Sequence, residues 1–357
     1  MISYIVYNYF SYSGAASQAK KLASSLGRHN IIFFNVITNS KFKFSKIHVK
    51  DDRLNFSVIN IRGGGIIRLL QFIYFFLRYK VKLVHLHGFH RDALISAYLL
   101  KKKILLKSTL DGKDDFDTLL NGKSKFINRF LLSKITFNNS LTTQIHNKNI
   151  QHSLTVPIDK IPNGIHCPTS NELMEEKQRI IIIVGAVIPR KNTLLGIQFF
   201  KDVFLSRGYK LFIIGPLNTQ NSEGDEFYSR ECMESINNCE HISFLGNLTT
   251  EQLNVIYKIS RFIIFLSKSE GMPNVLLEAI SFNITPIVRD DDLLSKSLLP
   301  KDTNEFDISF YYENIESAEI NALKLIESQT LILHSKTYNI KVIANKYNEV
   351  YLKYFDL

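Results

Sequence analysis

The sequence predicts an α/β protein with two doubly wound, Rossmann-like domains that face each other across a cleft. Its length of 357 residues is enough for two domains of roughly 100 to 200 residues each. Short runs rich in β-branched and aromatic residues alternate with helical patterns, as they do in βαβ units. This alternation weakens once, near residue 161, and then begins again.

Composition indicates an ordinary globular protein, because 45% of the residues are hydrophobic and 22% are charged. Cys167, Cys232 and Cys239 show no CxxC spacing, so we expect free thiols rather than disulfides or a zinc site. No apolar run approaches the roughly 18 to 20 residues of a membrane span, and the first residues lack the basic region of a signal peptide. We therefore expect a cytoplasmic location.

Residues 1–165 form the first predicted domain. Its strands are predicted at Ser3–Phe10, Asn30–Thr38, Asn55–Ile61, Lys82–Gly88 and Ile104–Asp111. Helices fill the gaps between them. The boundary is predicted at Ile161–Gly164, where a proline and an Asn-Gly turn precede the polar stretch Pro168–Arg179.

Residues 166–334 form the second predicted domain. It begins with the apolar run Arg179–Ala186, which is typical of a strand buried on both faces of a parallel sheet. Further strands are predicted at Lys210–Pro216, Ile242–Asn247, Arg261–Ser267 and Thr285–Arg289, and helices at Asn192–Arg207, Glu226–Asn237, Thr249–Ile259 and Asn274–Phe282. No strand follows the predicted helix in residues 335–357, so this helix is a candidate to pack back on the first domain.

Charge is divided unevenly along the chain. Residues 1–165 contain 25 Lys and Arg against 8 Asp and Glu, a balance of +17, whereas the remaining residues contain 19 against 25, a balance of −6. Such an asymmetry predicts an anionic partner for the first half. The basic, aromatic stretch Ile66–Lys82 fits a helix in a bilayer interface, and fits equally a helix packed on the sheet with a basic outer edge. The charge balance favours peripheral contact with an anionic membrane, and the acidic half argues against nucleic acid.

The strongest chemical signal is the string SKSEGMPNVLLEA, Ser267–Ala279, which follows a predicted strand and opens a helix. Gly271 permits close backbone approach, Pro273 suits a helix start, and the free N–H groups there can receive a phosphate. Glu270 lies in the turn and Glu278 lies further along the helix. Because carboxylates repel phosphate, we interpret both as acceptors of hydrogen bonds from sugar hydroxyls.

This string resembles the acidic E-x7-E motif of retaining glycosyltransferase family four, which has the GT-B fold. The resemblance implies that Glu270 contacts the donor sugar and that Glu278 contacts the ribose hydroxyls. It also implies that the diphosphate and sugar contact the backbone of Gly271, Met272, Pro273 and Asn274. The alternative is a surface glutamate pair around an ordinary helix cap.

The loop Gly185–Asn192 resembles a second family segment, Gly-Arg followed by three or four variable residues and Lys, whose cations neutralise the leaving diphosphate. Gly185 and Lys191 match this segment. Ala186 stands where the family has arginine, and Arg190 is the candidate to supply the missing charge. A solvated Arg-Lys pair is the alternative, and it remains open for Arg190 in particular.

In the first domain, Gly14 lies in a strand-to-helix turn where the family often has two glycines near the donor phosphate and the acceptor. His87 precedes Gly88 at a strand end, where the family often places a histidine near the reacting carbon. His85 and His90 are open to a purely structural role. The stretch Lys107–Asp115 resembles an acceptor-side loop of capsule and O-antigen members, and we interpret Asp111, Asp114 and Asp115 as turn residues rather than metal ligands.

The resemblance implies a retaining, metal-independent hexosyltransferase. We expect it to move a hexose or N-acetylhexosamine from a nucleotide-diphosphate donor, UDP-linked, to a lipid-linked glycan of the capsule, O-antigen or lipopolysaccharide type. The donor is a substrate, so no cofactor is expected. A metal-dependent transferase that uses Asp290–Asp292 is the alternative fold and chemistry. A nucleotide-sugar epimerase and a catalytically inert sugar-nucleotide-binding subunit, suggested by Ala186, are alternative functions. A dehydrogenase is disfavoured because neither half has a GxGxxG fingerprint.

Overall fold

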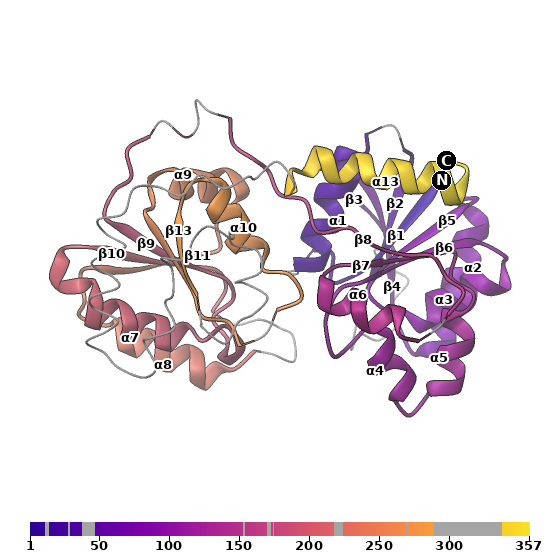
Figure 1. The fold of residues 1–357 in the computed structure, drawn as a ribbon, viewed down its shortest axis with the longest axis horizontal. Helices are drawn as coiled ribbons and strands as arrows, with labels where there is room; N and C mark the ends of the chain where they lie inside the picture. The colour runs from indigo at the N-terminus through magenta and orange to yellow at the C-terminus, as the bar shows by residue number, and fades with distance from the viewer. Residues whose placement is uncertain are drawn as a thin grey trace. The chain divides into compact units, whose positions relative to one another are not determined.

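The computed structural model describes residues 1–10, 14–27, 29–37, 47–152, 154–169, 173, 175–217, 224–268, 270–288 and 338–357. The chain divides into two compact units, drawn in Figure 1. Unit 1 comprises Met1–Gly164 together with Tyr338–Leu357, and unit 2 comprises Ile165–Thr337. Asp290–Asp292, Ser269 of the string Ser267–Ala279, and residues 11–13 of the turn before Gly14 lie outside the described residues.

Unit 1 is built on a sheet that has eight strands in the described residues, in the order β3-β4-β2-β1-β5-β6-β7-β8. The strands are β1 (Ile2–Tyr7), β2 (Ile31–Val36), β3 (His48–Asp51), β4 (Phe56–Ile61), β5 (Leu83–His87), β6 (Lys103–Ser108), β7 (Phe137–Ser140) and β8 (Ile158–Lys160). Only the pairing of the edge strand β3 with β4 is antiparallel among these. Parallel pairing of the others brings their carboxyl ends to one edge of the sheet.

Helices cover both faces of this sheet. They are α1 (Gly14–Ser25), α2 (Gly65–Arg78), α3 (Arg91–Leu99), α4 (Phe116–Asn121), α5 (Lys125–Leu132), α6 (Thr143–Ile150) and α13 (Ile340–Phe355). One buried cluster joins Tyr4 of β1 to α1 and α13. A second joins Ile5, the next residue of β1, to α2, α3, α4 and α5. Because neighbouring strand residues face opposite ways, these are the two sides of the sheet.

Helix α13, coloured yellow in Figure 1, follows unit 2 in the chain but packs in unit 1. The Tyr351 hydroxyl lies 2.8 Å from the hydroxyl of Tyr4 and 2.8 Å from Nδ1 of His85. Nδ2 of Asn139, on β7, donates to the Tyr347 hydroxyl over 2.6 Å. The helix therefore lies on one face of the first sheet and completes its core.

Unit 2 contains a five-stranded, fully parallel sheet in the described residues, in the order β11-β10-β9-β12-β13. Its elements are β9 (Ile180–Val184), η2 (Pro189–Lys191), α7 (Thr193–Val203), η3 (Leu205–Arg207), β10 (Lys210–Ile214), α8 (Glu226–Ile236), β11 (Ile242–Gly246), α9 (Thr250–Ile259), β12 (Phe262–Phe265), α10 (Asn274–Ser281) and β13 (Thr285–Val288). All five residues of β9 are buried, as the run of isoleucines predicts.

Several predicted elements end earlier in the structure, each for a local reason. The first strand ends at Tyr7 because Asn8 has a φ of +52°. The strand β6 ends at Ser108, since the Asp114 carboxylate binds the next two amides. The predicted helix Asn192–Arg207 is α7 followed by the separate turn η3, which ends at Gly208 with a φ of +70°.

Candidate functional site

Two loops of unit 2 meet at the carboxyl ends of the neighbouring strands β9 and β12. The loop after β9 leads into η2, which carries Arg190 and Lys191. The loop after β12 carries Ser267 and Glu270. A backbone hydrogen bond from the Lys268 amide to the Arg190 carbonyl, 2.8 Å long, holds the two loops together. The parallel sheet thus brings residues some 80 positions apart in the chain to one edge.

Glu270 and Lys191 form a direct ion pair, with Nζ 2.5 Å from Oε1. The same oxygen lies 3.3 Å from Nη1 of Arg190 and accepts a 2.6 Å hydrogen bond from Ser267 Oγ. Both members of the Lys191–Glu270 pair are less than one fifth exposed. Two cations against one carboxylate leave this cluster with one net positive charge, at the sheet edge where ligands of doubly wound folds bind.

Two glycines shape the backbone behind Lys191. Gly185 has a φ of +151°, which residues with a side chain rarely adopt, and the Lys191 stem lies against it. Gly215, after β10, has a φ of +136°, and a Cβ there would overlap the carbonyl oxygen of Gly185. Gly185 was predicted from the loop pattern. Gly215 was not, because only the pairing of β9 with β10 shows how closely the two backbones approach.

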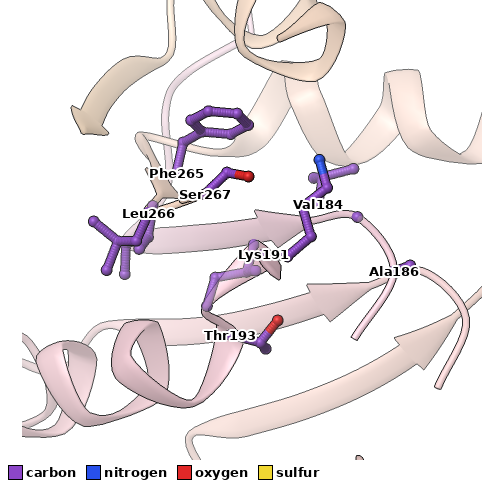
Figure 2. Close-up of a pocket in the computed structure, with 10 residues that line it drawn as sticks. Val184, Ala186, Lys191, Thr193, Phe265, Leu266 and Ser267 are labelled. Atoms are coloured by element: carbon purple, nitrogen blue, oxygen red, sulfur yellow. The ribbon is translucent and has the colours of Figure 1, made fainter. Parts of the chain in front are cut away.

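A small pocket lies beside this cluster (Figure 2). Lys191, Ser267, Gly185 and Ala186 contribute to its wall, together with Thr193 and the ends of β9 and β12. Among the described residues, the buried Thr193 hydroxyl makes no hydrogen bond. Thr193 was not predicted as a site residue, although its position two residues after Lys191 could have indicated that it lines the same pocket.

The rest of the acidic string follows the predicted strand-turn-helix order. Met272 and Pro273 are buried, and α10 begins at Asn274 without a side-chain cap. Glu278, partly buried on α10, accepts a long 3.5 Å hydrogen bond from the hydroxyl of Tyr257 on α9. The structure therefore brings Glu270 to Lys191 and Arg190, and places Glu278 beside α9.

His87 lies at the carboxyl end of β5 in unit 1 and is buried. Its ring stacks on that of His85, with centroids 4.3 Å apart, and among the described residues its Nε2 has no hydrogen-bond partner. Burial, followed by the neighbouring His85, Lys107 and His90, lowers its pKa well below the usual value. His87 is therefore a neutral imidazole at pH 7. Burial likewise lowers the pKa of His90 to about 3.

Lys107 is a basic residue whose role the sequence did not reveal. Lys107 lies on β6 and pairs in register with His87 on the adjacent strand β5, so both side chains lie on the same face of the sheet. Its buried Nζ donates to Oδ1 of Asn163 over 2.7 Å and lies 5.8 Å from the centre of the Tyr347 ring. Burial lowers the pKa of Lys107 to about 7. No carboxylate forms an ion pair with it in the described part of the chain.

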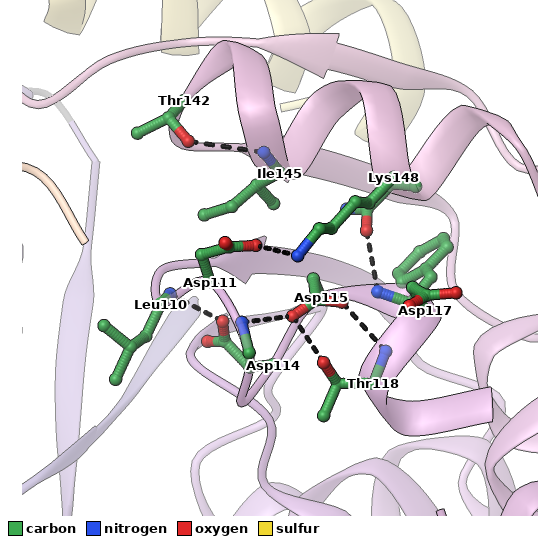
Figure 3. Close-up of polar contacts among 12 residues, drawn as sticks. Leu110, Asp111, Asp114, Asp115, Asp117, Thr118, Thr142, Ile145 and Lys148 are labelled. Carbon is green, nitrogen blue, oxygen red and sulfur yellow. Dashed lines mark hydrogen bonds and ion pairs between the residues drawn. The ribbon is translucent and has the colours of Figure 1, made fainter. Parts of the chain in front are cut away.

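The remaining first-domain candidates occupy simpler positions. Gly14 begins α1 and is exposed, with open space where a Cβ would stand. The aspartates after β6 bind their own loop (Figure 3): Asp111 pairs with Lys148 at 2.7 Å, Asp114 accepts amide hydrogens, and Asp115 caps α4. Across the described residues, no group of three His, Cys, Asp or Glu side chains is arranged to hold a metal. No helix of the same residues is long and apolar enough to cross a membrane.

The chain is similar in sequence and in fold to known proteins. Residues 170–332 match the family described as glycosyl transferases group 1. The capsular polysaccharide biosynthesis glycosyltransferase CapH of Staphylococcus aureus is 23% identical over 300 residues, which are 79% of this chain and 80% of that protein.

Two solved structures are similar over nearly the whole chain. Sucrose-phosphate synthase from Thermosynechococcus elongatus has a TM-score of 0.65 at 14% identity, with 99% of each chain covered. Anabaena Alr3699/HepE, solved in complex with UDP and glucose, has a TM-score of 0.66 at 11% identity, again with 99% of each covered. The predicted fold class is confirmed: the protein has the GT-B fold, and its residues 170–332 match the model of the glycosyl transferases group 1 family.

Proposed function

We propose that the protein is a retaining glycosyltransferase of family four that works without a metal. It moves a hexose or N-acetylhexosamine from a UDP-linked donor to a lipid-linked surface glycan, while in peripheral contact with an anionic membrane. The observation that carries this proposal is the Lys191–Glu270–Arg190 cluster at the carboxyl ends of β9 and β12. The capsular role in the name of CapH and the UDP and glucose bound to HepE support the donor and acceptor classes.

The cluster fits the main demand of the reaction. Breaking the bond between the anomeric carbon and the diphosphate oxygen leaves negative charge on the diphosphate. Cations already in place stabilise that charge without reorganisation. Lys191 is held by Glu270, by the Gly185 backbone and by the Phe265 ring, whose centre lies 5.6 Å from Nζ. The remaining N–H groups of Lys191 and the backbone N–H groups at the uncapped start of α10 then donate hydrogen bonds to the diphosphate.

Arg190 offsets the substitution of Ala186 for the family's arginine. Its guanidinium comes from another backbone position but reaches the same carboxylate oxygen as Lys191. The Glu270 oxygens accept hydrogen bonds from these cations and from the sugar hydroxyls. Glu278 accepts hydrogen bonds from the ribose hydroxyls. The acceptor oxygen forms its bond to the sugar on the face from which the diphosphate leaves. In this scheme Gly14 serves the donor phosphate and the acceptor, and His87 serves the reacting carbon, as the family resemblance implies.

A product assay tests the proposal. The full chain is incubated with UDP-linked sugars and membrane lipids that carry glycan precursors, and the products are separated by mass. Sugar on the lipid is the expected product. A free epimerised nucleotide sugar, or donor binding without turnover, would instead support the epimerase or the inert subunit.

Lys191→Ala should lower turnover by about 100- to 1000-fold, because a preorganised cation is lost from the transition state. Lys210→Ala is the matched control, since Lys210 is an exposed lysine at the opposite, amino end of β10. Unchanged turnover in the Lys191 variant would remove this residue from the mechanism.

A further inference from the structure

The outer side of the helix layer α2–α5 carries an unusual concentration of exposed apolar side chains. Helix α2 buries Phe72 and Phe76 against the sheet. Its opposite stripe is also apolar, with Ile66, Leu70, Tyr74 and Leu77 exposed and Ile66 reaching 79% exposure. A surface helix of a globular protein normally shows charged and polar residues there.

Helix α5 repeats this arrangement. Leu131 and Leu132 face the core, while Phe126, Ile127 and Phe130 are exposed, with Phe126 at 79%. The sequence analysis singled out only the stretch Ile66–Lys82 as a possible interfacial helix and did not identify α5.

Helix α3 joins α2 to α5. The Asp92 carboxylate lies 2.6 Å from Nε of Arg68 on α2, and Ser96 Oγ donates to the Leu69 carbonyl. At the other end, the Tyr98 ring meets the Phe130 ring of α5 edge-on at 5.3 Å. Figure 1 shows the three helices in one layer of unit 1. The exposed apolar residues of this α2–α3–α5 face are Ile66, Ile67, Leu70, Tyr74, Leu77, Tyr98, Leu99, Phe126, Ile127 and Phe130.

Basic side chains are mixed with these apolar ones. Asp92 is the only carboxylate on the three helices, and it is paired with Arg68. The five basic residues of the helices are Arg68, Arg78, Arg91, Lys125 and Arg129. Two lysines lie over exposed rings: Lys125 over Phe126 at 5.3 Å and Lys134 over Phe130 at 5.2 Å. Such lysines can hold their ammonium groups at the level of phosphates while the rings enter an apolar phase.

Unit 2 shows no comparable surface in its described part. Its exposed large apolar residues there are Phe227 and Val255, both isolated on separate helices. The chain from residue 166 onward also carries a net negative charge. Exposed apolar side chains and positive charge thus occur together in one unit, which is the combination that anionic lipid attracts.

We propose that the α2–α3–α5 face docks on an anionic phospholipid surface, with Phe126, Phe130, Ile66 and Leu70 inserted among the headgroups. This docking rests on the proposed function in one respect: a lipid-linked acceptor would lie in the membrane that the protein binds. The proposal names the surface and adds α5, which a contact through α2 alone does not include.

The test is co-sedimentation of the full chain with vesicles, without donor or acceptor. Vesicles of phosphatidylglycerol and phosphatidylcholine should bind the protein at least about tenfold more tightly than phosphatidylcholine alone, and high salt should weaken the binding. The double variant F126S/F130S should lose about tenfold or more of this affinity. F227S is the matched control, because Phe227 is 75% exposed in unit 2, and it should bind as wild type does.

Three outcomes would overturn the proposal: no vesicle binding by wild type at low salt, equal binding by the double variant, or equal loss in F227S. A wild-type dimer that F126S/F130S converts to a monomer, without vesicle binding, would identify a self-association surface instead. Donor binding, followed by thermal shift with UDP, separates this result from failure of the proposed function. A double variant that still binds UDP but not vesicles supports docking as a separate property of unit 1.

Discussion

Unit 1 and unit 2 both place a lysine at the carboxyl end of a parallel strand, but the surroundings of the two lysines have opposite effects on the charged form. In unit 2, Lys191 is partly exposed and paired with Glu270. In unit 1, Lys107 is buried beside the neutral His87, and its pKa falls to about 7. In unit 2, the carboxylate stabilises the protonated lysine. In unit 1, burial destabilises the protonated lysine and favours the neutral amine. Similar strand ends can therefore provide a fixed charge or a weak base.

The sharpest way to break this comparison is to replace each lysine by methionine. Lys107→Met should raise the free energy of unfolding by about 3 kcal/mol at pH 7, because it removes a penalty for burying the amine that exceeds its one hydrogen bond. Lys191→Met should lower it by about 1 kcal/mol, since Glu270 loses its closest cation. Urea unfolding of both variants, with Lys210→Met as an exposed control, measures the difference in sign.

The pH dependence provides a check on the Lys107 result. Between about pH 7 and the ordinary lysine value of 10.5, the unfolded state keeps a proton that the folded state has released. Wild-type stability should therefore rise with pH in this window, and the advantage of Lys107→Met should shrink toward pH 10. An advantage that does not change with pH would contradict the depressed pKa.

A second change tests the backbone that holds the unit 2 cluster. Gly215→Ala should destabilise the protein by about 2 kcal/mol, because a side chain there adopts a rare φ and overlaps the Gly185 carbonyl. Turnover should fall as well, since Gly185 supports Lys191. Gly14→Ala is the control for stability, because its Cβ enters open space. Equal thermal denaturation midpoints for wild type and Gly215→Ala would show that the two backbones can separate freely.

A third change asks how far the donor site extends from the cluster. Glu278→Gln should weaken UDP binding by about tenfold, because a charged acceptor for the ribose hydroxyls is lost. Tyr257→Phe removes the long, 3.5 Å hydrogen bond to Glu278 and should change the affinity by less than about twofold. Isothermal titration calorimetry measures both, and intact affinity in Glu278→Gln would refute the ribose role.

The smallest expected effect concerns two neighbouring hydroxyls in unit 2. Thr193→Val should stabilise the protein by up to about 1 kcal/mol, because the buried hydroxyl has no partner among the described residues. Ser267→Ala should destabilise it by about 1 kcal/mol, since it removes a hydrogen bond to Glu270. Thermal denaturation of the two variants distinguishes these signs. A loss of stability in Thr193→Val would indicate that its hydroxyl is satisfied.

Sequence reasoning succeeded where a chemical pattern and a burial pattern coincide. The isoleucine run of β9 predicts a strand buried on both faces, and the residues after it and after β12 lie next to each other as parallel pairing requires. The confirmed fold class depends on this kind of regularity. Lys191 and Glu270 could be named because the loops after these two strands resemble two segments of one glycosyltransferase family.

Prediction from the sequence failed where polar residues are buried. The strand β7, Phe137–Ser140, is absent from the predicted strands because Asn138, Asn139 and Ser140 interrupt the apolar pattern, yet all three are buried. Neighbouring elements satisfy their side chains: Asn149 Nδ2 of α6, for example, donates to Asn138 Oδ1 over 3.1 Å and to Ser140 Oγ over 3.0 Å. Only the arrangement of neighbouring elements reveals such partners. The burial of Lys107 escaped prediction for the same reason.

Helix α13 has a consequence for the order in which the chain can fold during synthesis. Ile343, Tyr347, Tyr351 and Phe355 belong to the core cluster on one face of the first sheet, but they follow the whole of unit 2 in the chain. The ribosome therefore produces every residue of unit 2 before the first sheet can be fully covered on that side, where α1 alone is available earlier. Until α13 arrives, Tyr4 and His85 lack their hydrogen bonds to Tyr351. The amino-terminal half of the chain, although it is made first, is the half that is finished last.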